Sequence, residues 1–129
     1  MTRRTLAAVV APLALLTLSA CSSGSSGTST PNTLPADAGL VVRAEPGLRF
    51  DQATYTASAG TVKVAYIDDD AQLHTLVIVS PDGSTLPHEL EVNKSGAVDS
   101  GTYTLVPGTY KLLCRIPGHQ NMKATVTVK

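Results

Sequence analysis

The stretch TVKVAYI, residues 61–67, decides the class of fold. Its apolar side chains Val62, Val64 and Tyr66 occupy every second position, which is the period of a β-strand with one buried face. Similar short runs rich in Val, Thr and Tyr recur from Leu40 onward, separated by Gly, Pro, Asp and Asn. None of these runs has the 3.6-residue period of a helix. The sequence therefore predicts an all-β domain.

Neighbouring runs indicate how many strands the domain has. LHTLVIV, residues 73–79, is almost continuously apolar, which is typical of a strand buried on both faces, and it ends at the turn SPDGS. Later runs in HELEV, GTYTLV, GTYKLLC and ATVTVK bring the total to roughly seven to eight strands, at the spacing of a β-sandwich. We expect the folded domain to occupy residues 40–129.

The beginning of the chain has a different pattern. Residues 1–20 place Arg3 and Arg4 before a short apolar run that ends in small residues, which is the layout of a signal peptide. The arginine pair also leaves twin-arginine export open, although the residues after it fit that pattern poorly. The ending LSAC resembles the lipobox of bacterial lipoproteins, in which cleavage precedes a cysteine that is then acylated. That resemblance implies lipidation of Cys21.

Residues 21–39 are dominated by Ser, Gly, Thr and Pro and have no apolar periodicity, so they are predicted to form a flexible tether after the lipidated cysteine. We therefore expect an exported protein, lipid-anchored to the outer face of the bacterial cell membrane. The whole chain has ten Lys and Arg against ten Asp and Glu. Because removal of residues 1–20 takes away two arginines, no basic footprint for nucleic acid remains.

The loop CRIPGHQNM, residues 114–122, carries three side chains that bind soft or borderline metals. The alternation of GTYKLLC points the Cys114 thiol inward, and a single thiol in an exported protein needs protection. His119 follows a Pro-Gly turn, and Met122 precedes the last strand. A fourth ligand must come from elsewhere. The candidate is His74, a polar ring at the head of an apolar strand.

This set of donors indicates the metal. Two imidazoles, a thiolate and a weak thioether suit copper in electron-transfer sites. Thiolate stabilises Cu(I), imidazole accepts either oxidation state, and a distant thioether constrains neither, so an electron can transfer with little rearrangement. Zinc also binds Cys and His, but the affinity order of divalent metals favours copper. We predict one type 1 copper as the cofactor.

The same residues resemble a known family. They form a G-x-Y-x-L-x-C run, a C-x4-H-x2-M loop and an upstream histidine, namely Gly108, Tyr110, Leu112, Cys114, His119, Met122 and His74. From about Leu48 to Lys129 the chain resembles the cupredoxins, the small blue copper proteins that include azurin, plastocyanin and amicyanin. The resemblance implies a Greek-key β-sandwich with copper ligands at His74, Cys114, His119 and Met122. It also implies that electrons enter at the edge of His119, beside Ile116 and Pro117.

Two positions depart from the family pattern. Thr75 follows the first histidine where many relatives carry Asn, and this change affects the hydrogen bonds that orient the upstream loop against the thiolate. Ala124 stands where many relatives carry Gly.

Other polar residues have simpler interpretations. His88, next to Pro87, is expected to be a solvated turn residue. Asp68, Asp69 and Asp70 lack the alternating spacing of a calcium loop and are expected to form an exposed acidic turn that docks a basic partner.

The predicted function is one-electron transfer between larger redox partner proteins, carried out by a monomer. No enzyme activity is expected, because catalysis on a substrate calls for an open coordination position that a four-ligand site lacks. Two alternatives stay open. One is a copper storage or delivery protein for oxidase assembly, and the other is a metal-free binding module with the cupredoxin fold.

Overall fold

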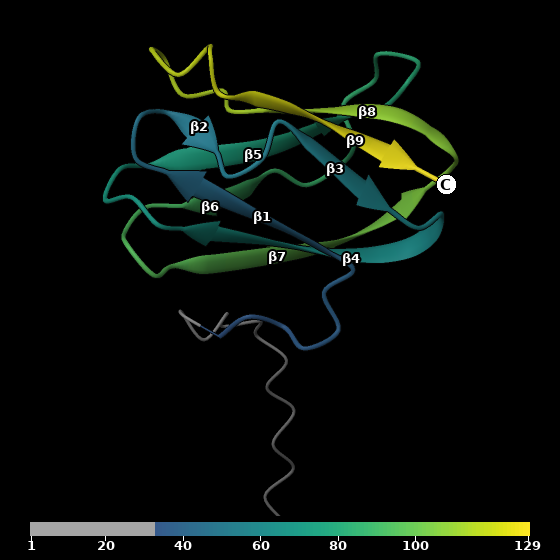
Figure 1. The fold of residues 1–129 in the computed structure, drawn as a ribbon, viewed down its shortest axis with the longest axis horizontal. Coiled ribbons are helices and arrows are strands. Elements are labelled where there is room, and N and C mark those ends of the chain that lie inside the picture. The colour runs from purple at the N-terminus through teal and green to yellow at the C-terminus, as the bar shows by residue number, and fades with distance from the viewer. Residues whose placement is uncertain (1–32) are drawn as a thin grey trace, which may run out of the picture.

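The computed structural model describes residues 33–129, which form two packed β-sheets (Figure 1). The predicted signal peptide, residues 1–20, and the predicted lipidation site, Cys21, lie outside the described residues. The strands are β1 (Leu40–Glu45), β2 (Arg49–Phe50), β3 (Thr54–Ala57), β4 (Gly60–Asp68), β5 (His74–Val79), β6 (Leu90–Val92), β7 (Val98–Leu105), β8 (Gly108–Leu113) and β9 (Lys123–Val128).

The two sheets confirm the predicted all-β sandwich. One sheet has the order β2-β1-β4-β7 and the other the order β3-β9-β8-β5-β6. The chain passes from one sheet to the other several times, so β1 pairs parallel with β4 and β3 pairs parallel with β9. Residues 33–129 form nine strands because β2 is a two-residue strand, paired with β1 across a turn, that is too short to have a periodic pattern.

The core lies between the sheets and follows the predicted alternation. Val62, Val64 and Tyr66 of β4 are all buried. In β5 only the last residue is not fully buried, as the continuous apolar run predicts. Phe50 meets the ring of Tyr66 edge-on, with ring centroids 6.2 Å apart. Aliphatic side chains supply most of the remaining core.

The register of the five-stranded sheet brings distant segments together. β5 pairs antiparallel with β8, with Val77 opposite Leu113, and β8 continues into β9 through the loop 114–122. Continuing the same register toward the start of β5 leads to His74 and Thr75. The head of β5 therefore lies beside the end of β8 and the loop that follows it.

The acidic turn differs from its predicted exposed form. Asp68, the last residue of β4, is fully buried, and its backbone N–H donates to the Ala97 carbonyl over 2.9 Å. The carboxylate of Asp69 pairs with Arg43 over 2.9 Å. The expectation of a free acidic docking surface is therefore wrong for Asp68, because the segment around Ala97 covers the end of β4.

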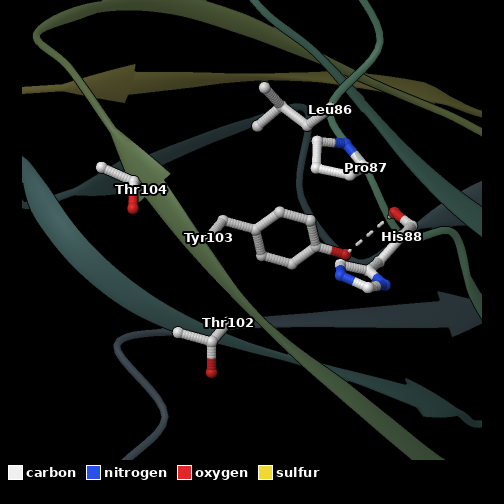
Figure 2. Close-up of a pocket in the computed structure, with 6 residues that line it drawn as sticks. All are labelled: Leu86, Pro87, His88, Thr102, Tyr103 and Thr104. Atoms are coloured by element: carbon white, nitrogen blue, oxygen red, sulfur yellow. Dashed lines mark hydrogen bonds between the residues drawn. The ribbon is translucent and has the colours of Figure 1, made fainter.

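His88 is exposed, as predicted. It adopts a φ of 70° and lines a surface pocket of about 290 Å³ with Leu86, Pro87 and Tyr103, whose hydroxyl donates to the His88 carbonyl over 3.2 Å (Figure 2). None of the predicted metal ligands lines this pocket.

The last residues of the predicted tether contact the domain. The Gly39 N–H donates to the Lys63 carbonyl over 2.8 Å, and the Asp37 carboxylate pairs with the Lys63 ammonium group over 2.7 Å. Between residues 33 and 129, no helix has the length and apolar character needed to cross a membrane.

Candidate metal centre

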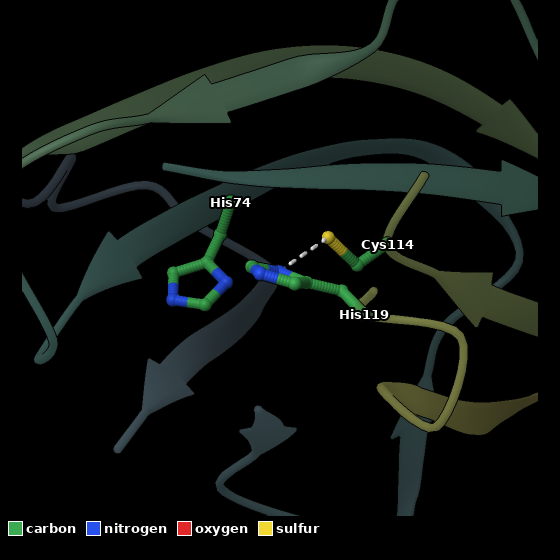
Figure 3. Close-up of side chains that lie close together, drawn as sticks. All are labelled: His74, Cys114 and His119. Atoms are coloured by element: carbon green, nitrogen blue, oxygen red, sulfur yellow. Dashed lines mark hydrogen bonds between the residues drawn. The ribbon is translucent and has the colours of Figure 1, made fainter. Parts of the chain in front are cut away.

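Three of the four predicted ligands come together at one end of the sandwich (Figure 3). His74 begins β5, Cys114 directly follows β8, and His119 lies in the loop between β8 and β9. One ligand atom from each lies within 4.8 Å of the others, and all three residues are buried. The Cys114 Sγ is 3.6 Å from the His119 Nδ1, and the two imidazole centroids are 5.0 Å apart. This arrangement matches the spacing of donor atoms around one metal ion.

The His74 ring is the strongest indication that the site holds a metal. The residue has 0% of its surface exposed, and its Nδ1 has no hydrogen-bond partner among residues 33–129. Its Nε2 lies 3.4 Å from the Asp70 Oδ2. A buried polar atom without a partner costs about 1–3 kcal/mol. A metal ion bonded to the Nδ1 would remove this cost, so the residues present fit such an ion.

The loop that carries the other ligands is held by its own backbone. The Cys114 N–H donates to the Met122 carbonyl over 3.1 Å, which closes the loop at its base. The His119 N–H donates to the Ile116 carbonyl and the Met122 N–H to the His119 carbonyl, each over 2.9 Å. Gly118, with a φ of 91°, makes the turn before His119 in a conformation that favours glycine. These backbone hydrogen bonds fix the conformation of the loop 114–122.

Met122 is the fourth predicted ligand. Only 1% of its surface is exposed, and its backbone bonds place it directly beside Cys114. A thioether here is enclosed within the protein, on the loop that also supplies the thiol and the second imidazole. Its role as an axial donor stays a prediction.

The thiol has hydrogen-bond donors around it. The Thr75 N–H lies 3.5 Å and the Thr75 hydroxyl 3.8 Å from the Cys114 Sγ. The same hydroxyl accepts the Arg115 N–H over 3.0 Å. In the sequence Thr75 is a departure from the family pattern, but these contacts depend on the pairing of β5 with β8 and could not be predicted from it. Its position directly after His74 was the available signal.

The carboxylates of Asp68 and Asp70 precede His74 in the segment that leads into the site, and the Asp70 carboxylate contacts the His74 ring. The pKa of Asp70 is lowered, mainly because the backbone N–H of Ala71 donates a hydrogen bond to the Asp70 Oδ1 over 2.6 Å. Burial raises the pKa of Asp68. Asp70 was not among the predicted site residues, although its place four residues before His74 was the signal that could have indicated it.

The two imidazoles differ in their access to solvent. His119 has 8% of its surface exposed, whereas His74 has none. Next to His119 in the loop, Ile116 is half-buried against the core and Pro117 is exposed. Of the two imidazole residues, the one predicted for electron entry, His119, is therefore the less buried.

Of the comparisons with known proteins, the one with solved structures informs the fold. No protein-family model matches the chain, and no curated protein matches it in sequence. Among solved structures, auracyanin A, a "blue" copper protein from Chloroflexus aurantiacus, superposes with a TM-score of 0.60 and 24% identity, covering 69% of this chain and 96% of that one. A reduced amicyanin variant has a TM-score of 0.57 and 20% identity, covering 80% of this chain and 95% of that one.

A purple cupredoxin from Nitrosopumilus maritimus has a TM-score of 0.54 and 17% identity, covering 70% of this chain and 99% of that one. Each of these structures is therefore matched over nearly its whole length. At these identities the likeness establishes the architecture of the chain, a cupredoxin-type sandwich.

Proposed function

We propose that this chain, which has the cupredoxin fold, binds one type 1 copper through His74, Cys114, His119 and Met122 and carries single electrons. The observation that supports this most directly is the cluster of three donor atoms from buried residues within 4.8 Å, one of them an imidazole nitrogen with no hydrogen-bond partner among the described residues. The fold is shared with proteins whose names describe them as blue copper proteins or cupredoxins.

Copper in this site would supply a one-electron Cu(II)/Cu(I) couple. The residues around it are arranged to keep their positions during electron transfer. The loop is closed by the bond between the Cys114 N–H and the Met122 carbonyl, and the thiol is held by Thr75. Ligands that keep their positions when the metal is oxidised or reduced lower the reorganisation energy of electron transfer.

Electrons are proposed to enter and leave through His119. Of the two imidazole residues it is the less buried, with 8% of its surface exposed, and the neighbouring Ile116 and Pro117 offer an apolar surface for contact with a redox partner protein. His74 lies too deep to serve as this contact.

The proposed location rests on the beginning of the sequence. An exported monomer attached through lipid on Cys21 would act at the outer face of the cell membrane, with residues 22–39 as spacer. Metabolic labelling with a fatty acid tests this, and we expect incorporation that Cys21→Ala abolishes. Label retained by that variant would refute the anchor and leave the copper proposal intact.

Copper binding is tested by adding Cu(II) to the purified, metal-free protein. We expect uptake of one copper per chain, an intense visible thiolate-to-copper band and a narrow parallel hyperfine splitting in EPR. Cys114→Ser should abolish both signals. Met122→Leu should keep the colour and raise the reduction potential, because Cu(II) loses a weak donor.

Two results would favour the alternatives. Colourless protein that binds only Cu(I) would support copper storage or delivery. Protein that takes up no copper in either oxidation state would support a metal-free binding module.

A further inference from the structure

We propose that Asp70 is a positioning residue for His74: its carboxylate accepts a hydrogen bond from the Nε2–H and so holds the ring in the tautomer whose Nδ1 lone pair faces the metal. This inference rests on the proposed function, since it concerns how the chain prepares one of the four ligands. It assigns a role to part of an acidic run that the sequence alone does not connect to the site.

The contact identifies which ring nitrogen carries the proton. The Asp70 Oδ2 lies 3.4 Å from the His74 Nε2, and only 13% of the Asp70 side chain is exposed. An ionised carboxylate can only accept a hydrogen bond. The Nε2 is therefore the donor, and in a neutral ring the Nδ1 then carries the lone pair.

No other group in residues 33–129 performs this task. The Nδ1 of His74 has no hydrogen-bond partner, and the ring is completely buried. Its contact with Asp70 is the one hydrogen bond that selects the tautomer within the described part of the chain. Carboxylates that hold the far nitrogen of a metal-binding imidazole typically change metal affinity by about 10–100-fold.

The turn between β4 and β5 holds the Asp70 carboxylate in place. The buried Asp68 accepts the Asp70 N–H through its Oδ1 over 2.8 Å. The Gln72 side chain donates to the Asp70 Oδ2 over 3.1 Å, and the Ala71 N–H donates to the Oδ1 over 2.6 Å. Backbone and side-chain bonds thus connect the end of β4 to the ring that begins β5.

Asp69 provides a matched control on the same turn. Its carboxylate pairs with Arg43 over 2.9 Å, and no hydrogen bond joins it to His74 in the described residues. Asp69→Ala and Asp70→Ala therefore remove the same charge from adjacent positions, but only the second removes the contact with the imidazole.

The experiment reads the tautomer directly in metal-free protein. With ¹⁵N-histidine labelling at about pH 8, well above the ordinary imidazole pKa of about 6.5, NMR distinguishes Nε2–H from Nδ1–H rings. We expect His74 to be in the Nε2–H form in the wild type and in Asp69→Ala, and a mixture of tautomers in Asp70→Ala. Asp70→Asn should keep the Nε2–H form, because its amide oxygen still accepts.

Metal affinity provides the second measurement. Zn(II) titration should show affinity about 10–100-fold lower in Asp70→Ala than in Asp69→Ala, with Asp70→Asn closer to the wild type. The same tautomer and the same Zn(II) affinity in Asp70→Ala and Asp69→Ala would overturn the proposal. Because neither measurement uses copper, a missing blue band would count against the proposed function and not against the role of Asp70.

Discussion

At the scale of single residues, Thr75 connects the two segments that supply the ligands. Its hydroxyl accepts the Arg115 N–H over 3.0 Å and lies 3.8 Å from the Cys114 Sγ. Because the acceptor side is used by Arg115, the hydroxyl proton is free to point at the sulfur. Hydrogen bonds to the cysteine sulfur are among the features that tune the potential of such copper sites.

Thr75→Val tests this role, since the two side chains have nearly the same shape. The Arg115 N–H loses its acceptor, and we expect metal-free protein to be destabilised by about 1–3 kcal/mol in urea denaturation. Copper-loaded protein should have a lower reduction potential, because the thiolate becomes a stronger donor to Cu(II). Thr75→Ser, which keeps the hydroxyl, should match the wild type; if it behaves like Thr75→Val, the hydroxyl is not responsible.

Asp68 is a second residue whose environment has a measurable consequence. It is fully buried, and its Oδ2 has no hydrogen-bond partner in the part of the chain that the structure describes. Burial raises its pKa in the folded protein. The folded protein therefore retains this proton at pH values where the unfolded chain has lost it, and stability falls as pH rises from about 4 through the folded pKa.

Asp68→Asn removes this titration and keeps the oxygen that accepts the Asp70 N–H. We expect the variant to gain stability relative to the wild type as pH rises, with the difference shrinking as pH falls toward about 4. Urea denaturation of metal-free protein across this pH range provides the measurement. A stability difference between the two proteins that does not change with pH would mean that the Asp68 carboxyl has the same pKa in the folded and the unfolded chain.

At the scale of elements, β8 carries a core face and leads directly into the residue that bears the thiol. Tyr110, Leu112 and Cys114 are all buried, as the alternation predicts. The Tyr110 hydroxyl accepts the Val106 N–H over 3.0 Å and donates to the Val106 carbonyl over 3.1 Å. One side chain thus satisfies both backbone groups of a residue in the connection between β7 and β8.

Tyr110→Phe removes both bonds and leaves these groups unpaired. We expect the free energy of unfolding to fall by about 1–3 kcal/mol, measured by urea denaturation. Tyr66→Phe serves as a comparison, because among residues 33–129 the Tyr66 hydroxyl makes only one long hydrogen bond, of 3.5 Å, to the Thr75 carbonyl. We expect Tyr66→Phe to lower the free energy of unfolding by less than about 1 kcal/mol. Equal decreases in the free energy of unfolding of the two variants would show that the connection between β7 and β8 does not depend on the Tyr110 hydroxyl.

At the scale of the whole molecule, the proposed ligands join segments far apart in the chain. His74 starts β5, whereas the other three lie between the end of β8 and the start of β9. Bringing these segments together requires the five-stranded sheet to be formed. The folded protein should consequently bind metal much more tightly than the unfolded chain, which links binding to stability.

Zn(II) should therefore stabilise the fold. At a free concentration of about 100 times its Kd, one site adds about 2.7 kcal/mol, so Tm should rise. Thermal unfolding followed by circular dichroism measures this, with Cys114→Ser as the control that should show a much smaller shift. Equal shifts in both proteins would place the bound zinc elsewhere.

Much of this structure could be predicted from local pattern. The alternation in β4 and β8 indicates which side chains face inward, because strand periodicity is a property of consecutive residues. The short loop 114–122 likewise shows that a thiol, an imidazole and a thioether lie close together. Asp68 was the main failure, since the segment that buries it lies almost thirty residues further along the chain.

The amino-acid sequence by itself determined the class of fold, the inward thiol and the kinds of donor atoms at the site. Only the tertiary structure decided that His74 faces Cys114 and His119, that Thr75 bonds the sulfur and that Asp70 holds the imidazole. The physical reason is that alternation and turn chemistry act between neighbours in the chain. Strand register instead follows from packing and hydrogen bonding across the whole sandwich.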